Sequence, residues 1–327
     1  MSPDTWLPWN QGRWLDATRK YAVTIPPPPP CDTSCPTCPL PCLPDPIPQP
    51  GDDERLQLAQ MANSTTGLDG QPLRYAKLMK GNDAVSWIEA HAEEFDRLLS
   101  TTKTMHFIPP ADKPPDRLAF YYNPQCSIKN GTDKRVRGTY GDRSDYTGAV
   151  SANTASLETV MVLLNATLSE PDARFTTADI KDFFLMSDLV RPEYMWILLT
   201  QIPADRMQSA YYNGSKYAVN GKVVLVKLTK GIYELPQAAL LAKQRLDTLL
   251  ATHGYLETPT LCLYKLVSRP IMLTLVVDDF GIKSHGQEHL DHLLNTLRTI
   301  YTIKTGDGTK YLCMTLEWDY IHRTVAK

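Results

Sequence analysis

The sequence predicts an α+β fold, in which a sheet layer is covered by helices on one face. The elements expected after residue 83 do not repeat the strand-helix unit that an alternating α/β fold requires. The chain holds 43% hydrophobic and 21% charged residues, a balance typical of globular domains. It contains no Gly-x-Gly-x-x-Gly or Gly-x-x-x-x-Gly-Lys loop, so neither common phosphate-binding loop favours a doubly wound sheet.

Residues 1–50 differ in composition from the rest of the 327-residue chain. They hold a large share of its 26 prolines, including the run from Pro26 to Pro30. We predict a disordered Pro/Cys-rich leader there, followed by a linker over residues 51–83. Cysteines crowded into CDTSCPTCPLPC could bind zinc, but prolines interrupt their spacing and no helix or hairpin follows. The pattern therefore favours a low-complexity leader over a zinc module.

The first ordered element is predicted to be a helix that begins near Asp83 and ends before Pro109. Its apolar stripe consists of Val85, Ile88, Phe95, Leu98 and Leu99, with Trp87 and Ala92 beside it. A strand at 120–122 leads into a basic segment, 117–150, in which glycines around GTDKRVRGTYG indicate a hairpin. A second helix follows in SLETVMVLLNATL, with one face formed by Leu157, Val160, Met161 and Leu164.

The second half of the chain begins with three predicted strands, in RFTTADI, EYMWILL and residues 222–228. The next helix has Pro236 in its first turn and Gly254 at its end, with an apolar side formed by Ala239, Ala242, Leu246, Leu249 and Leu250. The hairpin IMLTLVVDDFGI is followed by an amphipathic helix whose stripe is Leu290, Leu293, Leu294, Leu297 and Tyr301. A strand over YLCMTLEWDY completes the order.

Two acidic signals far apart in the sequence both emerge from strand-like apolar runs. Asp179 follows RFTTA, and Asp278 with Asp279 follow LTLVV. Mg²⁺ prefers carboxylate oxygens held on a rigid frame, so these positions suit a metal site. Taken alone, an Asp-Asp-Phe-Gly sequence is also ordinary hairpin-turn chemistry. His285, His289 and His292 lie on one helical stretch without a carboxylate or cysteine at ligand spacing, so we do not expect them to bind metal.

Charge and hydropathy limit the possible locations and partners. A net charge of −2 gives no overall basic field of the kind that nucleic-acid-binding proteins often display. Residues 117–150 form a local basic segment, which fits a nucleic-acid contact and a solvated loop about equally well. The sequence has no run of about 20 apolar residues and no signal-peptide pattern. We therefore expect an intracellular, cytoplasmic protein without a membrane partner.

Six motifs in order resemble the reverse transcriptases of copia-type retrotransposons, over most of residues 84–320. SWIEAHAEEFDRLL is similar to the family's leading helix, and KRVRGTYGDRSDY to its fingers hairpin. TADIKDFFL with the downstream EYM resembles the first catalytic motif. GIYELPQA, LVVDDFGI and YLCMTLEW resemble the motifs that follow, the last being the strand that supports the primer terminus.

This resemblance implies a right-hand polymerase palm with fingers, built on an antiparallel sheet backed by helices, with the thumb largely absent. The leading helix and fingers would span residues 84–170, and the palm residues 171–327. The implied activity is RNA-directed DNA polymerase, a nucleotidyl transfer to a primer 3′-hydroxyl with two Mg²⁺ ions, for which Mn²⁺ could substitute. The implied partners are an RNA or DNA template with its primer and deoxynucleoside triphosphates, within retroelement particles. The oligomeric state is left open.

The resemblance also assigns roles to single residues. Asp179, Asp278 and Asp279 would be the catalytic metal carboxylates, with Asp278 favoured over Asp279 as the direct ligand because neighbouring strand residues face opposite sides. Phe184 would lie under the incoming sugar, and Gln237 beside the new base pair. Lys134, Arg135 and Arg137 are the candidates for holding the triphosphate. Lys304 and Lys310 are alternatives for protonating pyrophosphate.

Several positions depart from the family's pattern. Val276 stands where an aromatic residue is usual, and Glu234 and Cys313 stand where glycine is usual. The sequence ends at Lys327, just after the last palm-like strand, from which we expect a truncated or degenerate copy without a thumb. The main alternative is thus a catalytically inactive retroelement fragment that retains nucleic-acid binding. A third is an interaction protein whose function lies in the Pro/Cys-rich leader.

Overall fold

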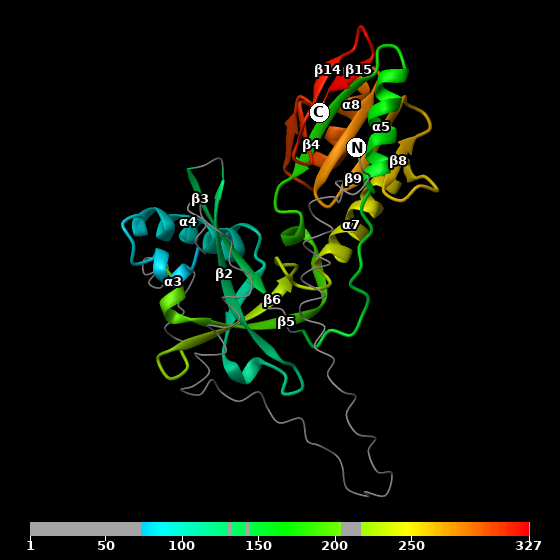
Figure 1. The fold of residues 1–327 in the computed structure, drawn as a ribbon. Helices are drawn as coiled ribbons and strands as arrows, with labels where there is room; N and C mark the ends of the chain where they lie inside the picture. The colour runs from blue at the N-terminus through cyan, green and yellow to red at the C-terminus, as the bar shows by residue number, and fades with distance from the viewer. Residues whose placement is uncertain (1–72, 130–131, 141–143, 204–216, 327) are drawn as a thin grey trace, which may run out of the picture. The chain divides into compact units, whose positions relative to one another are not determined.

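The computed structural model describes residues 73–129, 132–140, 144–203 and 217–326 (Figure 1). All of these residues belong to one compact unit of the chain. The predicted leader and most of the predicted linker lie outside the described residues. Residues 73–83 contain the short helix α3 (Tyr75–Leu78). Among the described helices, none combines the length and apolar character needed to cross a membrane.

The fold is α+β, with several sheets and few helices. It differs from the single sheet layer that we predicted, because the strands divide between a five-stranded and a six-stranded sheet. The strands predicted at EYMWILL and 222–228 pair with each other. They join the sheet of the strand that begins at Ala119, and not the sheet of the strand that carries Asp179. Strand alternation predicts which face a residue occupies, but it does not predict which strand becomes the neighbour.

The five-stranded sheet carries the basic hairpin. Its order is β1 (Met105–Ile108), β6 (Val223–Lys230), β5 (Asp188–Leu198), β2 (Ala119–Lys129) and β3 (Asp133–Tyr140). The β2–β5 pair is parallel and the other pairs are antiparallel, so this sheet is mixed. Helix α4 (Ala84–Asp96) and the π-helical turn Arg97–Thr101 pack against it through Phe95 and Leu98.

The buried face of α4 differs from the predicted stripe. Val85 and Ile88 are 69% and 42% exposed, whereas the buried residues of the helix include His91 and Glu94. The two ring nitrogens of His91 lie within hydrogen-bonding distance of the Tyr75 and Tyr122 hydroxyls, at 2.7 and 3.0 Å. Burial lowers the pKa of His91 to about 3, so the imidazole is neutral. Hydrogen bonds with the two tyrosines thus allow a polar residue, His91, to lie in the buried face that hydropathy predicted to be apolar.

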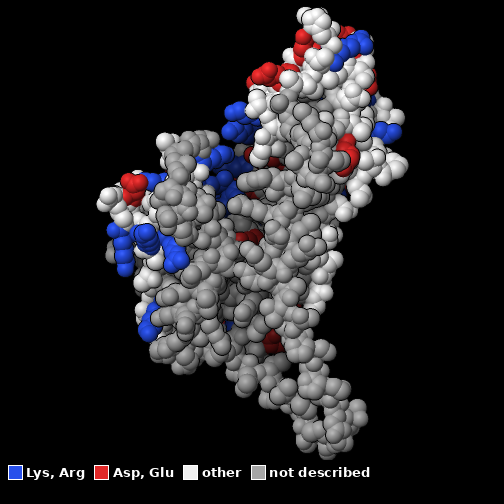
Figure 2. Space-filling model, viewed as in Figure 1, with Lys and Arg blue, Asp and Glu red and all other residues white. Residues whose placement is uncertain are grey.

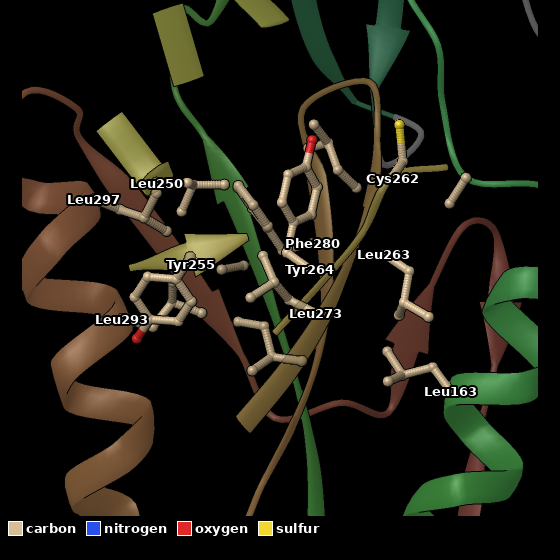
Figure 3. Close-up of a cluster of buried hydrophobic side chains, with 14 of the residues drawn as sticks. Leu163, Leu250, Tyr255, Cys262, Leu263, Tyr264, Leu273, Phe280, Leu293 and Leu297 are labelled. Atoms are coloured by element: carbon tan, nitrogen blue, oxygen red, sulfur yellow. The ribbon is translucent and has the colours of Figure 1, made fainter. Parts of the chain in front are cut away.

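The six-stranded sheet is antiparallel throughout. Its order is β11 (Ile303–Gly306), β4 (Arg174–Ile180), β10 (Asp279–Ser284), β9 (Ile271–Val276), β8 (Leu263–Leu266) and β7 (Tyr255–Glu257). Its main core cluster combines strand residues such as Phe280 and Leu273 with Leu163 and Leu293 from two helices (Figure 3). Because side chains alternate along β10, Asp279 points to the face opposite Phe280.

Three helices contribute to this core: α5 (Leu157–Ser169), α7 (Ala238–Thr252) and α8 (Gln287–Arg298). The stripe predicted for α8 is confirmed, since all five of its residues are buried. The stripe predicted for α5 is partly wrong, because Leu157 and Met161 are 45% and 48% exposed. Its buried positions are Thr159, Val160, Leu163, Leu164 and Thr167. The predicted stripe had the correct helical period, but it lay at one edge of the observed buried face, so only Val160 and Leu164 of its residues are buried.

The strand predicted over YLCMTLEWDY is wrong. Residues 310–326 form two short hairpins, β12 (Lys310–Tyr311) with β13 (Met314–Thr315), and β14 (Glu317–Asp319) with β15 (Thr324–Ala326). Leu312 and Cys313 form the first turn, with φ angles of 48° and 64°. Positive φ at both central residues is the type I′ pattern of two-residue hairpins, which favours Asn-Gly.

Replacing Cys313 with glycine is therefore expected to stabilise the protein. A side chain at positive φ costs about 1–2 kcal/mol, and the extra freedom of glycine in the unfolded chain offsets part of the gain. We expect Cys313→Gly to raise the free energy of unfolding by roughly 0.5–1 kcal/mol in urea titrations. Cys313→Ser keeps the side chain at this φ and should leave the free energy unchanged. A loss of stability in Cys313→Gly would contradict the assigned turn.

Candidate active site

Two strands that are distant in the sequence bring the acidic signals together. β4 and β10 are antiparallel neighbours, and Asp179 lies directly opposite Asp279. Side chains opposite each other on one sheet face have Cβ atoms about 4.5–5.5 Å apart. Asp278 lies in the turn between β9 and β10, where its carbonyl accepts a hydrogen bond from the Ile180 amide at 3.1 Å. All three carboxylates therefore belong to one end of the β4–β10 pair.

Backbone geometry fixes this end of the sheet. Val276 pairs with Asp279, so Val277 and Asp278 form a two-residue turn, and Val277 has φ 60°. Positive φ is a strained conformation for a β-branched residue. Two residues beyond Asp279, a Cβ on Gly281 would lie 2.9 Å from both the Thr274 hydroxyl and the Tyr311 ring. Glycine at 281 thus allows Tyr311 to lie across the face that carries the carboxylates.

The pKa values of Asp278 and Asp279 are both raised. Burial, followed by the charge of Asp179, raises the pKa of Asp278 above its ordinary value. Burial, followed by the charges of Asp278 and Asp179, raises the pKa of Asp279 from 3.8 to about 6. Such shifts arise where like charges lie close together in a partly desolvated site. A bound cation would relieve this repulsion.

The donor set suits magnesium chemically. Carboxylate oxygens on adjoining strands are the hard ligands that Mg²⁺ prefers. Within the described residues, however, no three His, Cys, Asp or Glu side chains form a ready metal-binding cluster. Mg²⁺ commonly takes one or two carboxylates and completes its coordination with water and substrate phosphates. Asp179, Asp278 and Asp279 could hold the ion in that way.

The raised pKa of Asp279 predicts a pH-dependent stability. Between pH 3.8 and about 6, the folded protein keeps a proton that the unfolded chain releases, so stability falls as pH rises through this window. Asp279→Asn should therefore raise the free energy of unfolding at pH 7 in EDTA by roughly 1–2 kcal/mol, because one pKa unit corresponds to about 1.4 kcal/mol and partial exposure weakens the effect. Urea titrations should show this gain shrink towards pH 4. An equal gain at both pH values would contradict it.

The carboxylates line a cleft of about 780 Å³. Its walls also carry the rings of Phe183, Phe184 and Tyr233 and many basic side chains, namely Arg97, Lys129, Arg135, Arg137, Lys181, Lys304 and Lys310. Figure 2 shows Lys and Arg side chains gathered in the middle of the face that it displays. The cleft therefore combines an acidic patch with a larger basic lining, which suits a polyanion that arrives together with a divalent cation.

β3 supplies two of the arginines that line the cleft, Arg135 and Arg137. Burial, followed by repulsion from Arg137, lowers the pKa of Arg135. Arg137 lies over the Tyr233 ring at 4.6 Å, and its buried Nε has no hydrogen-bond partner among the described residues. Tyr233 in turn makes an edge contact with Phe184 at 5.9 Å. A buried guanidinium nitrogen that has no partner in the described part of the chain, such as Arg137 Nε, is suited to bind an anion such as a phosphate.

Phe184 begins a short 3-10 turn, Phe184–Met186, which is separated from the end of β4 by residues 181–183. A Cβ on Gly231 would lie 2.5 Å from the Phe184 carbonyl oxygen, so the chain at 231 must be glycine to approach this turn. Lys304 on β11 lies opposite Asp179, on the side away from Asp279. The row across three strands is therefore Asp279, Asp179 and Lys304.

The structure does not bring Lys134 or Gln237 into this cleft. Lys134 forms an ion pair with Asp83 at 3.0 Å and lies over the Trp87 ring at 5.9 Å. Gln237 is 2% exposed, and its amide donates to Glu193 at 3.0 Å. The other predicted site residues line the cleft together: Asp179, Asp278, Asp279, Phe184, Arg135 and Arg137.

Several cleft residues were not predicted from the sequence. Tyr233 lies within GIYELPQA, and Lys129 within the basic segment, so both were near recognised motifs. Arg97 begins the π-helical turn that follows α4, and no sequence pattern distinguished it from an ordinary surface arginine. Lys304 was proposed only as an alternative to Lys310, and both line the cleft.

Comparisons with known proteins give limited information. No family model and no curated protein matches the chain. A solved structure of the foamy viral protease-reverse transcriptase, in complex with double-stranded DNA, is weakly similar, with a TM-score of 0.36 and 11% sequence identity. The match covers 65% of this chain and 30% of that one. A likeness of this strength says nothing about activity.

Proposed function

We propose that the described residues form the fingers and palm of a copia-type retrotransposon reverse transcriptase. In this proposal the five-stranded sheet with α4 is the fingers, and the six-stranded sheet with α5, α7 and α8 is the palm. β5 and β6 thus join the fingers sheet, although they lie within 171–327, the range first predicted for the palm. The observation that carries the proposal is the placement of Asp179 opposite Asp279, with Asp278 in the adjoining turn, in the same cleft as Arg135 and Arg137.

The proposed reaction is the template-directed addition of a deoxynucleotide to a primer 3′-hydroxyl. Two Mg²⁺ ions would lower the pKa of that hydroxyl and neutralise the charge on the triphosphate and the leaving pyrophosphate. Asp179 and Asp278 would hold the ions, with Asp279 assisting. Arg135 and Arg137 would bind the triphosphate oxygens from the opposite wall, where guanidinium geometry matches phosphate.

Phe184 is proposed to contact the sugar of the incoming nucleotide. Its ring lies in the cleft wall against Tyr233, and its turn follows the strand of Asp179. A rigid aromatic ring in that place would clash with a 2′-hydroxyl and so favour deoxynucleotides. Gln237 has no proposed contact with substrate in this arrangement, because Glu193 holds its side chain.

Primer extension tests the proposal directly. The full chain should extend a labelled DNA primer on an RNA or DNA template when Mg²⁺ and deoxynucleoside triphosphates are present, and EDTA should stop the reaction. Ribonucleotides should be incorporated poorly. Absence of extension with both Mg²⁺ and Mn²⁺, by folded protein that binds the primer-template, would overturn the catalytic proposal.

One observation favours an alternative, a catalytically inactive retroelement fragment that still binds nucleic acid. The carboxylates do not form a ready metal-binding cluster within the described residues, and Cys313 lines the cleft at a position where the family usually has glycine. This alternative predicts primer-template binding that weakens steeply with salt, because phosphate contacts release counterions, and no incorporation. Incorporation that requires Mg²⁺ would exclude it.

A further inference from the structure

Arg97 forms the centre of a chain of polar contacts between the two sheets. Its guanidinium donates to Asp182 Oδ1 at 2.9 Å and, through its other terminal nitrogen, to Glu94 Oε2. The second oxygen of Glu94 accepts a hydrogen bond from the Gly138 amide at 2.9 Å. The complete chain runs from Gly138 through Glu94 and Arg97 to Asp182, and we call it the Arg97 strut.

Both ends of the strut meet elements that carry cleft residues. Gly138 directly follows Arg137 on β3, where Arg135 also lies. Asp182 lies in the turn between Asp179 at the end of β4 and Phe184 at the start of the 3-10 turn. The strut therefore connects the strand of the cleft arginines to the loop that separates the carboxylate strand from the aromatic wall.

The strut is partly shielded from solvent. The side chains of Glu94, Asp182 and Arg97 are 1%, 10% and 18% exposed, so water competes weakly for these contacts. Arg97 and Asp182 also line both the main cleft and a neighbouring pocket of about 430 Å³. The Arg97–Asp182 pair thus lies between two solvent-accessible spaces. A planar guanidinium bound at two nitrogens constrains direction as well as distance.

We infer that Arg97 is a positioning residue, which sets the separation between the triphosphate-binding arginines of β3 and the carboxylates of β4 and β10. This inference rests on the proposed polymerase function. Reacting groups must be held closely, and a displacement of about 1 Å can lower a rate by roughly 100-fold. Arg97 contacts neither metal nor substrate in this role. It acts through Gly138 and Asp182.

A substitution at Asp182 removes one end of the Arg97 strut with little disturbance of the backbone. Its φ is 59°, a conformation that glycine adopts without strain, so Asp182→Gly removes the partner of Arg97 while keeping the backbone favourable. Asp172 provides a matched control, because it is an exposed aspartate with φ 61° that does not line the cleft. Asp172→Gly makes the same chemical change at the same backbone conformation, away from the strut.

Two measurements on the full chain test the inference. Hydrogen exchange should be roughly threefold faster at the Gly138 amide in Asp182→Gly, and faster still in Arg97→Ala, because the acceptor Glu94 loses its support. Primer extension should show kcat/KM for the nucleotide lowered about 10-fold to 100-fold in both variants, with primer-template affinity nearly unchanged. Arg97→Lys should recover only part of the rate, since an ammonium cannot bind both carboxylates in a fork geometry.

The two measurements distinguish a failure of the inference about Arg97 from a failure of the proposed polymerase function. Faster exchange at Gly138 together with lower kcat/KM supports the inference, provided that Asp172→Gly changes neither quantity. If Asp182→Gly matches Asp172→Gly in both measurements, the strut does not position the site. If exchange accelerates while even the unchanged protein incorporates no nucleotide, the contact between the sheets is real and the polymerase function is wrong. If exchange accelerates but kcat/KM holds, the strut only stabilises the fold.

Discussion

Replacing Asp278 or Asp179 with asparagine is expected to lower kcat for nucleotide incorporation by about 1,000-fold or more. Each change removes a negative charge from the proposed metal site while keeping the size of the side chain. Metal stabilisation of developing charge is worth several kcal/mol, and each 1.4 kcal/mol corresponds to about tenfold in rate. Asp279→Asn should lower kcat less, because Asp279 is proposed to assist. Single-turnover primer extension at saturating Mg²⁺ measures these effects.

Asp291→Asn is the matched control for these substitutions. Asp291 is an exposed aspartate on α8 that pairs with Gln287, so its replacement should leave kcat unchanged. Affinity for the primer-template, measured by fluorescence anisotropy, should stay within about twofold in all variants, since base and phosphate contacts supply it. Wild-type rates in Asp278→Asn and Asp179→Asn would exclude the proposed mechanism.

Phe280→Ala is expected to destabilise the protein by about 3–5 kcal/mol. Phe280 has no exposed surface and lies in the main core cluster beside Tyr264 and Leu273 (Figure 3). Truncating the ring removes a large buried apolar area and leaves a cavity among strands that cannot collapse easily. The preceding residue of β10 is Asp279, so loosening the packing here should also disturb the carboxylate row. Urea unfolding at pH 7 measures the change in free energy.

Phe280→Leu separates the cavity effect from any effect of substitution itself. Leucine fills most of the space, so the free energy of unfolding should fall by only about 1–1.5 kcal/mol. A similar loss in both variants would mean that the site collapses around the smaller side chain. Activity measured well below the melting temperature should fall in Phe280→Ala even where the protein is fully folded, because Asp279 shares its strand.

Apolar runs and motif order together predicted a good part of the candidate site. Asp179 and the Asp278–Asp279 doublet each end an apolar run of the kind that forms a buried strand, and the resemblance in motif order assigned them to one site. Alternation along β3 places Arg135 and Arg137 on one face of the strand, and Lys134, the residue before Arg135, on the other. The sequence therefore contained a reason to prefer the two arginines over the lysine, which ends on the side of Trp87 and Asp83.

What the sequence did not predict depends on partners that are distant along the chain. Gln237 follows a recognisable helix start, but its side chain is fixed by Glu193, whose burial no local pattern indicated. The α8 stripe was predicted fully because its apolar and polar faces are sharply separated. The α4 stripe was not, because His91 and Glu94 are buried by hydrogen bonds with tyrosines and with a backbone amide. Hydropathy carries no information about such pairs.

In the described part of the chain, the two large sheets share no strand, and their backbone ladders are complete without each other. The cleft nevertheless takes its arginines from one sheet and its carboxylates from the other. A ligand that bridges both walls would act as an additional cross-link, and mass action would then raise the melting temperature with ligand concentration. In such a protein, the affinity for substrate and the stability of the folded state would be thermodynamically linked.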